Sequence, residues 1–226
     1  MPELPDWFRD VAEYILRVGL PETLRIAAIS VTASAVVGII LGTLITIRFW
    51  PLHALVRFYI ELWRGLPILV TILFIYWLPA YHIGSHEIRL NAYMSAALGL
   101  SLWGSAQVAE ATRGAVQSIP REQHEAAAAL GFGWVGRHVF VIAPQALRRL
   151  LPPFVSLLVN IIQNTTIAFI IGVPETLETG NRQFENLTLQ TGDGHPFAIF
   201  GFVALIFFVI SFPLTRLAAY LERRLV

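Results

Sequence analysis

Five long runs without a charged side chain constrain this chain more than any other feature of its sequence. They cover residues 26–47, 65–81, 90–109, 150–174 and 196–215. A helix of about 20 apolar residues crosses the roughly 30 Å hydrocarbon core of a bilayer. Because the chain is 56% hydrophobic and only 14% charged, it is too apolar for an ordinary soluble domain. We therefore expect an all-α membrane protein with five transmembrane helices.

The first residues follow a different, amphipathic pattern. One helical face of residues 5–18 is apolar and another is charged. The apolar face holds Trp7, Phe8, Val11, Tyr14, Ile15 and Val18, and the charged face holds Asp6, Asp10, Glu13 and Arg17. Such a helix is typical of a membrane interface. We expect an interfacial helix over residues 1–19, ended by Gly19 and Pro21, and then one transmembrane domain over residues 20–226.

The arginines indicate an orientation, since cytoplasmic loops carry an excess of basic residues. Five spans place the two termini on opposite sides. With the N-terminus outside, the inner side holds most of the arginines: Arg48, Arg57, Arg64, Arg113, Arg121, Arg137, Arg148, Arg149, Arg216, Arg223 and Arg224. This distribution predicts an N-out, C-in topology with residues 114–149 in the cytoplasm.

Composition also excludes several kinds of chemistry. The basic residues are all Arg, and the chain has neither Lys nor Cys. Without Lys there is no Walker A motif and no Lys Schiff base, and without Cys there is no thiolate metal site. The His-Glu pairs at 86–87 and 124–125 lack the second His of a zinc-protease helix. We expect no catalytic residue, metal or cofactor in this chain, so that any ATP chemistry comes from another chain.

The loop at residues 114–149 is itself patterned. Pro120 and Glu122 suit a first helical turn, and residues 126–129 are four alanines, the strongest helix formers. Gly131 is a natural residue for the position after a helix end. This stretch predicts a short helix followed by a turn.

The spacing within that stretch resembles the EAA loop of ABC-importer permeases. The matching residues are Glu125, Ala126, Ala127, Gly131 and Pro144. The resemblance implies that the loop is a cytoplasmic coupling helix, which docks on the ATPase subunit, and that these five residues couple transport to ATP hydrolysis. An Ala-rich helix capped by Gly, without any such role, is the alternative interpretation of the same residues.

Three further stretches resemble permeases of polar amino acid uptake systems. They are YIELWRGLP at 59–67, AEATRGAVQSIPREQHEAA at 109–127 and NTTIAFIIGVPE at 164–175. The resemblance implies a type I importer permease of the bacterial inner membrane, with five spans and the N-terminus outside. It also implies a second permease subunit, identical or different, a dimer of ATPase subunits that bind ATP and Mg, and an extracytoplasmic amino-acid-binding protein. Gln163 and Asn164 stand where many relatives have Lys-Asp, which leaves the charge of the substrate side chain open.

Two charged pairs lie close to span ends. Glu61 with Arg64, and Glu110 with Arg113, are spaced i, i+3, so that each pair shares a helix face and can neutralise itself. One interpretation is structural pairing, and the other is a cytoplasmic gate or substrate contact.

Amide side chains suggest where substrate passes. Ser156, Asn160, Gln163 and Asn164 form one polar stripe, and a helix starting near Pro152 would place the amides about 17 Å along a core of roughly 30 Å. We expect this stripe to face a water-filled path, unless the amides serve helix–helix hydrogen bonds. Trp103, Gln107 and Glu110 are expected to form an opposite wall. The predicted path residues are Trp103, Gln107, Asn160, Gln163, Asn164 and Thr165.

These observations favour a non-enzymatic permease subunit that imports a polar amino acid. The alternative is a self-sufficient secondary transporter or channel for a small polar solute, which normally has an acidic or His residue at mid-span to couple an ion. The five uncharged runs hold no such residue. An intramembrane hydrolase needs a nucleophile and a base at membrane depth, and these runs hold Ser and Thr but no His or Asp. Lipid is an expected partner, and the net charge of +1 gives no indication of nucleic acid binding.

Overall fold

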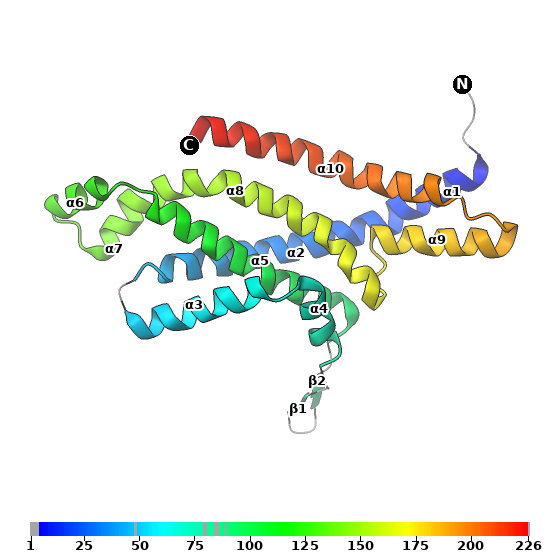
Figure 1. The fold of residues 1–226 in the computed structure, drawn as a ribbon, viewed down its shortest axis with the longest axis horizontal. Helices are drawn as coiled ribbons and strands as arrows, with labels where there is room; N and C mark the ends of the chain where they lie inside the picture. Colours follow the sequence, from blue (N-terminus) through cyan, green and yellow to red (C-terminus); the bar gives the residue numbers. More distant parts are fainter. Residues whose placement is uncertain (1–4, 48, 79–80, 84–85, 89, 226) are drawn as a thin grey trace. The chain divides into compact units, whose positions relative to one another are not determined.

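The computed structural model describes residues 5–47, 49–78, 81–83, 86–88 and 90–225, and helices make up most of this part (Figure 1). The α-helices are α1 Asp6–Tyr14, α2 Leu20–Leu44, α3 Trp50–Gly65, α4 Ile68–Tyr76, α5 Ala92–Gln117, α6 Arg121–Ala129, α7 Trp134–Gly136, α8 Ala143–Asn164, α9 Thr176–Thr191 and α10 Pro196–Leu225. Two π-helical turns, η1 Ile15–Gly19 and η2 Arg137–Ile142, and a 3₁₀ segment, η3 Thr165–Ile171, extend them. The all-α expectation therefore holds apart from a short antiparallel hairpin, β1 Tyr81–Ile83 and β2 His86–Ile88.

The residues pack into two compact units, each built from three stretches of the chain. The first unit contains Met1–Ser30, Pro67–Leu100 and Asn160–Pro213, and the second contains Val31–Leu66, Ser101–Val159 and Leu214–Val226. Each of four helices is therefore divided between the two units, with one part of its length in each: α2, α5, α8 and α10.

Three helical runs among the described residues are long and apolar enough to cross a membrane. They are Asp6–Leu44, Trp134–Ile171 and Pro196–Leu225. The pair α3 and α4 adds a fourth run if it is counted as one span, but it is bent by 99°. The bend falls at Leu66 and Pro67, both in extended conformation, because Pro67 disfavours the helical conformation of the residue before it.

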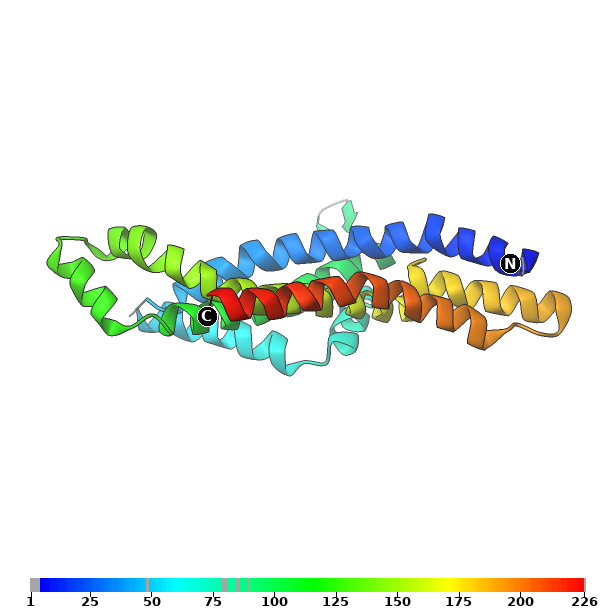
Figure 2. The same cartoon turned by 90° about the horizontal axis from the view of Figure 1, so that it is seen from above.

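The N-terminal helix differs from the expectation. Gly19 and Pro21 do not end it, since the turn η1 joins α1 to α2 in one helical run (Figure 2). Its apolar face is not free to lie on a bilayer, because Val11 and Ile15 are buried in a cluster with Ile199 and Val203 of α10. A Cβ on Gly19 would lie 2.2 Å from the Thr179 hydroxyl of α9, so only Gly permits this close contact.

The helix that precedes the 3₁₀ segment also begins earlier than predicted. It is continuous from Trp134, and Pro152 and Pro153 lie inside α8 rather than at its start. Each of these prolines lacks the backbone N–H of a regular helical turn, so the helix passes them with two fewer backbone hydrogen bonds. The predicted depth of Gln163 and Asn164 in the membrane assumed a helix that starts at Pro152. That assumption is wrong, because the helix starts at Trp134.

Helix α2 packs on α5 through small residues that recur every four positions. In the first unit Ser30 donates a hydrogen bond to the Ala97 carbonyl at 3.3 Å. In the second unit Ser34 donates to the Ser101 carbonyl at 3.3 Å, and a Cβ on Gly42 would lie 2.4 Å from the Ala109 carbonyl. Small side chains let helix backbones approach closely where lipid provides no hydrophobic drive between helices.

Buried polar groups fix the start of α9 in the first unit. The Glu175 carboxylate is fully buried and accepts hydrogen bonds from the backbone N–H groups of Leu177 and Glu178, at 2.9 and 2.8 Å. Thr23 of α2 accepts a hydrogen bond from the Thr176 N–H at 3.0 Å. The pKa of Glu175 is raised to about 7, mainly by burial and also by the Glu178 carboxylate, although the two N–H donors act against this.

We predict that Gly42→Leu destabilises the protein by at least about 1–3 kcal/mol, because its side chain must displace the backbone of α5. Gly201→Leu is the matched control, since no atom lies within 4 Å of a Cβ at Gly201. Thermal unfolding of the purified chain in detergent measures both. Equal melting temperatures for the two variants would contradict the close contact.

We also predict that Glu175 makes stability depend on pH. Its pKa is higher in the folded chain than its ordinary value of 4.5, so this stabilisation is complete below pH 4.5 and is lost as pH rises through about 7. The loss is of the order of 3 kcal/mol. The melting temperature of Glu175→Gln should fall less between pH 4.5 and 7 than that of the wild type. Glu185→Gln removes an exposed carboxylate from α9 and should leave the pH dependence unchanged. An unchanged pH dependence in Glu175→Gln would refute the prediction.

Candidate functional site

Helix α6 and its turn form the first candidate site, in the second unit. Pro120 precedes the helix, and Gly131 follows its end with φ +83°, as the sequence predicts. The Gly131 N–H donates to the Ala128 carbonyl at 2.9 Å, and the Phe132 N–H donates to the Ala127 carbonyl at 3.1 Å. These two bonds are those of a Schellman motif. They reverse the chain so that α7 and η2 return beside α6.

Two neighbouring faces of α6 have different surroundings. Ala127 is buried, and Gln123 accepts a hydrogen bond from Gln145 of α8 at 3.3 Å. Next to this face Glu122, Ala126 and the following Leu130 are exposed. One face of the helix is therefore packed, and the strip of Glu122, Ala126 and Leu130 is free.

The five residues predicted to couple transport to ATP hydrolysis lie along this element. Glu125 and Ala126 are exposed on α6, and Ala127 faces η2. Gly131 forms the turn, and Pro144 lies in the first turn of α8. The structure thus brings four of the five into one helix–turn element and places Pro144 at the helix that leaves it.

A cluster of charged residues on α3 and α5 forms the second candidate site. Glu110 accepts hydrogen bonds from Arg113 at 3.0 and 2.6 Å, which confirms the predicted pair. Arg57 and Arg64 of α3 approach the same carboxylate, at 3.6 and 3.9 Å. One carboxylate is therefore shared by three guanidinium groups.

The predicted pairing of Glu61 with Arg64 is wrong. Glu61 instead pairs with Arg57, one helical turn earlier, at 2.7 Å. Arg64 turns to α5, where its Nε donates to Gln107 at 3.3 Å. The sequence analysis missed Arg57, although its i, i+4 spacing to Glu61 is a signal for this pair.

A cavity of about 440 Å³ lies beside this cluster, within the second unit. It is lined by Arg64, Gln107, Glu110, Ala111, Pro153, Ser156 and Leu157. The cavity brings together predicted path residues from α5 with Ser156 of the polar stripe on α8. Its volume is in the range of small-molecule pockets.

The remaining predicted path residues are not among those that line this cavity. Trp103 is half-buried on α5. Asn160 and Gln163 are exposed on α8, and the Gln163 Nε2 donates a hydrogen bond to the Ser211 hydroxyl of α10 at 3.4 Å. Thr165 is fully buried, and its hydroxyl donates to the Ile162 carbonyl at 2.7 Å.

Asn164 marks a change in helix geometry. The α-helix α8 ends at this residue, and the 3₁₀ segment η3 continues to Ile171, where Gly172 ends it with φ +74°. A 3₁₀ segment in a long helix often marks a hinge. The polar stripe is thus largely unpacked within the chain and ends where the helix tightens.

These features define a membrane subunit of a solute importer. Residues 34–226 match the family model described as "Binding-protein-dependent transport system inner membrane component". Since the match covers most of the chain, the protein belongs to this family of ABC transporter permeases and is a multi-pass protein of the inner membrane.

Individual relatives are similar over nearly the whole chain. The probable glutamine ABC transporter permease protein GlnP of Bacillus subtilis (strain 168) is 35% identical over 208 residues, or 91% of each chain. The glutamine transport system permease protein GlnP of Escherichia coli (strain K12) is 31% identical over 211 residues, or 93% of each chain. A solved structure, "Crystal structure of an amino acid ABC transporter with histidines", aligns with a TM-score of 0.79 and 25% identity over 98% of this chain and 100% of that chain.

Proposed function

We propose that this permease imports a polar amino acid with an uncharged side chain. The observation that carries this proposal is the amide pair at the point where α8 gives way to the 3₁₀ segment, in which Gln163 is exposed and Asn164 is half-buried. Amides present both donors and acceptors without a net charge. The names of the B. subtilis and E. coli relatives, which are glutamine permeases, support the same substrate class.

The proposed assembly follows the expectation from the sequence. Two permease subunits, identical or different, work with a dimer of ATPase subunits and an extracytoplasmic amino-acid-binding protein. ATP and Mg are bound by the ATPase, and this chain carries out no catalysis. Membership of a family of binding-protein-dependent transport systems supports the last of these partners, the binding protein.

We further propose five membrane spans with the N-terminus outside and the C-terminus inside. The bent pair α3–α4 and the long helix α5 supply the spans beyond the three apolar runs. Helix α5 is less apolar because it carries small and polar side chains, such as Ser105, whose hydroxyl hydrogen-bonds the Tyr59 hydroxyl of α3 at 2.7 Å. One of the arginines that favour this orientation, Arg48, lies outside the described residues.

Helix α6 is proposed as the contact with the ATPase. Its exposed strip of Glu122, Ala126 and Leu130 permits close approach of another protein surface, and the Schellman turn at Gly131 fixes its direction. The structural connection from α6 through η2 into α8 provides a continuous path from this contact to the amide pair.

We predict that Gly131→Asp and Glu125→Lys each reduce transport at least tenfold while the chain still inserts and binds the ATPase. The first change strains a backbone with φ +83°, and the second reverses a charge on α6. Transport and ATP hydrolysis by reconstituted complexes measure the coupling.

Gly133→Asp is the control for the added charge, because Gly133 has an ordinary φ of −66° and precedes α7, where Asp is favoured. It should retain coupling. Wild-type transport in both Gly131→Asp and Glu125→Lys would refute the role of α6.

For the substrate, we predict that Gln163→Leu and Asn164→Leu abolish transport and leave assembly with the ATPase intact. Leu has a similar size but offers no hydrogen bond. Gln190→Leu, the same change at an exposed position on α9, should transport normally. Normal transport with unchanged substrate preference in both stripe variants would show that the amides serve packing.

A further inference from the structure

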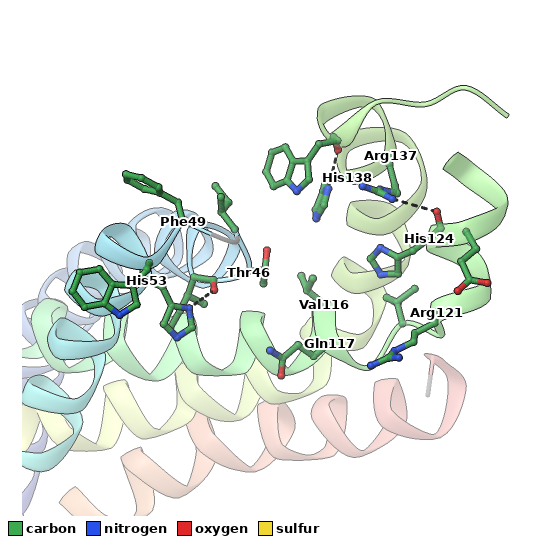
Figure 3. Close-up of a pocket in the computed structure, with 15 residues that line it drawn as sticks. Thr46, Phe49, His53, Val116, Gln117, Arg121, His124, Arg137 and His138 are labelled. Atoms are coloured by element: carbon green, nitrogen blue, oxygen red, sulfur yellow. Dashed lines mark hydrogen bonds between the residues drawn. The ribbon is translucent and has the colours of Figure 1, made fainter. Parts of the chain in front are cut away.

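A second, larger cavity in the same unit has no part in the function proposed above. Its volume is about 1370 Å³, and it lies among the ends of α2 and α5, the start of α3 and the α6–η2 element (Figure 3). All of these segments belong to the second unit.

The charged lining of this cavity is mainly basic. Arg121 and Arg137 face it together with His53, His124 and His138, and Glu125 is the single acidic residue among its described lining residues. Figure 3 shows that these side chains come from α3 on one side and from α6 and η2 on the other. The cavity therefore favours an anion.

Hydrogen bonds hold several of these basic groups in place. The His53 Nδ1 lies 3.0 Å from the Ile45 carbonyl, and the His138 Nδ1 lies 2.8 Å from the Trp134 carbonyl. The imidazole of His138 also stacks on Trp134, with ring centroids 4.1 Å apart. With both Nδ1 atoms engaged, each Nε2 remains to contact a ligand.

Arg137, which lines the cavity, has an N–H donor that is available to a ligand. Arg137 donates from Nη1 to the His124 carbonyl at 3.5 Å, and its Nε is buried without an acceptor among the described residues. A buried donor without an acceptor is unfavourable. The pKa of His124 is lowered first by burial and then by the positive neighbours His138 and Arg137, so that this group too experiences an excess of positive potential.

The position of the cavity indicates which anion. Ile45 and Ile47, in its lining, directly follow the apolar helical run Asp6–Leu44. Phe49 and Trp50, also in the lining, are 58% and 80% exposed. Exposed aromatic side chains at the end of a span are typical of the membrane–water interface. A basic pocket with an apolar rim at that level matches a phosphate headgroup with its acyl chains attached.

We propose that this cavity binds an anionic phospholipid, with the headgroup phosphate between Arg121 and Arg137 and the acyl chains along Phe49 and Trp50. Arg121, His124 and Glu125 of α6 line the cavity, so that the bound lipid lies against this helix. The lipid thereby contacts the element that is proposed to couple to the ATPase, although its binding does not depend on that role.

Quenching of tryptophan fluorescence by brominated lipid tests this proposal. The full-length chain, purified with its ATPase in detergent and phosphatidylcholine, receives phosphatidylglycerol or phosphatidylcholine with dibrominated acyl chains at equal mole fraction. The difference between wild type and Trp50→Phe isolates the signal of Trp50. We expect brominated phosphatidylglycerol to quench Trp50 at least twofold more than brominated phosphatidylcholine.

Variants then assign this preference to the cavity. The double variant Arg121→Gln/Arg137→Gln should lose it, and Arg121→Gln alone, which changes an exposed side chain, should weaken it even if the double variant does not fold. Arg223→Gln/Arg224→Gln, with the same loss of charge at the exposed end of α10, should retain it.

Two outcomes would overturn the proposal. One is equal quenching by the two lipids, or a preference that persists in the cavity variants. The other is loss of the preference on addition of millimolar glycerol phosphate, which would identify a site for a soluble anion rather than for a lipid.

Discussion

Close packing of α2 against α5 is the contact on which the rest of the structure depends. In a lipid environment helices gain little from burying apolar surface, so that backbone approach through small residues must hold them together. Gly38 and Gly42 meet this need in the second unit, where a Cβ on either would clash with α5. The same region of α5 supplies Gln107 and Glu110. Their placement therefore depends on small side chains of α2.

Irregular helix geometry occurs next to the features proposed to function. The turn η1 packs Gly19 on α9, the turn η2 follows α6, and the segment η3 begins after Asn164. Each interrupts the regular helical bonds without breaking the helical run, which satisfies the backbone in an apolar environment. The amide pair therefore belongs to one helical run, Trp134–Ile171, and only the short turn after α6 separates this run from that helix.

Local patterns in the sequence predicted local structure well. The end of α6 at Gly131 and the pair Glu110–Arg113 follow from backbone preference and helical spacing alone. The partner of Arg64 could not be predicted in this way, because Gln107 lies on another helix and competes with Glu61 for the guanidinium group. The start of α8 was misjudged because prolines usually mark a helix start, whereas here the helix was already formed. The basic cavity combines separate segments with no common spacing, so the sequence gives no signal for it.

The central claim is that this chain passes an uncharged polar amino acid under control of an ATPase. Its most direct test is ATP hydrolysis by the complex of permease, ATPase and binding protein in nanodiscs, measured across a panel of amino acids. Our account predicts severalfold stimulation by glutamine or a similar neutral polar amino acid, and none by arginine or glutamate. Stimulation by a charged amino acid alone, or by none of the panel, would contradict it.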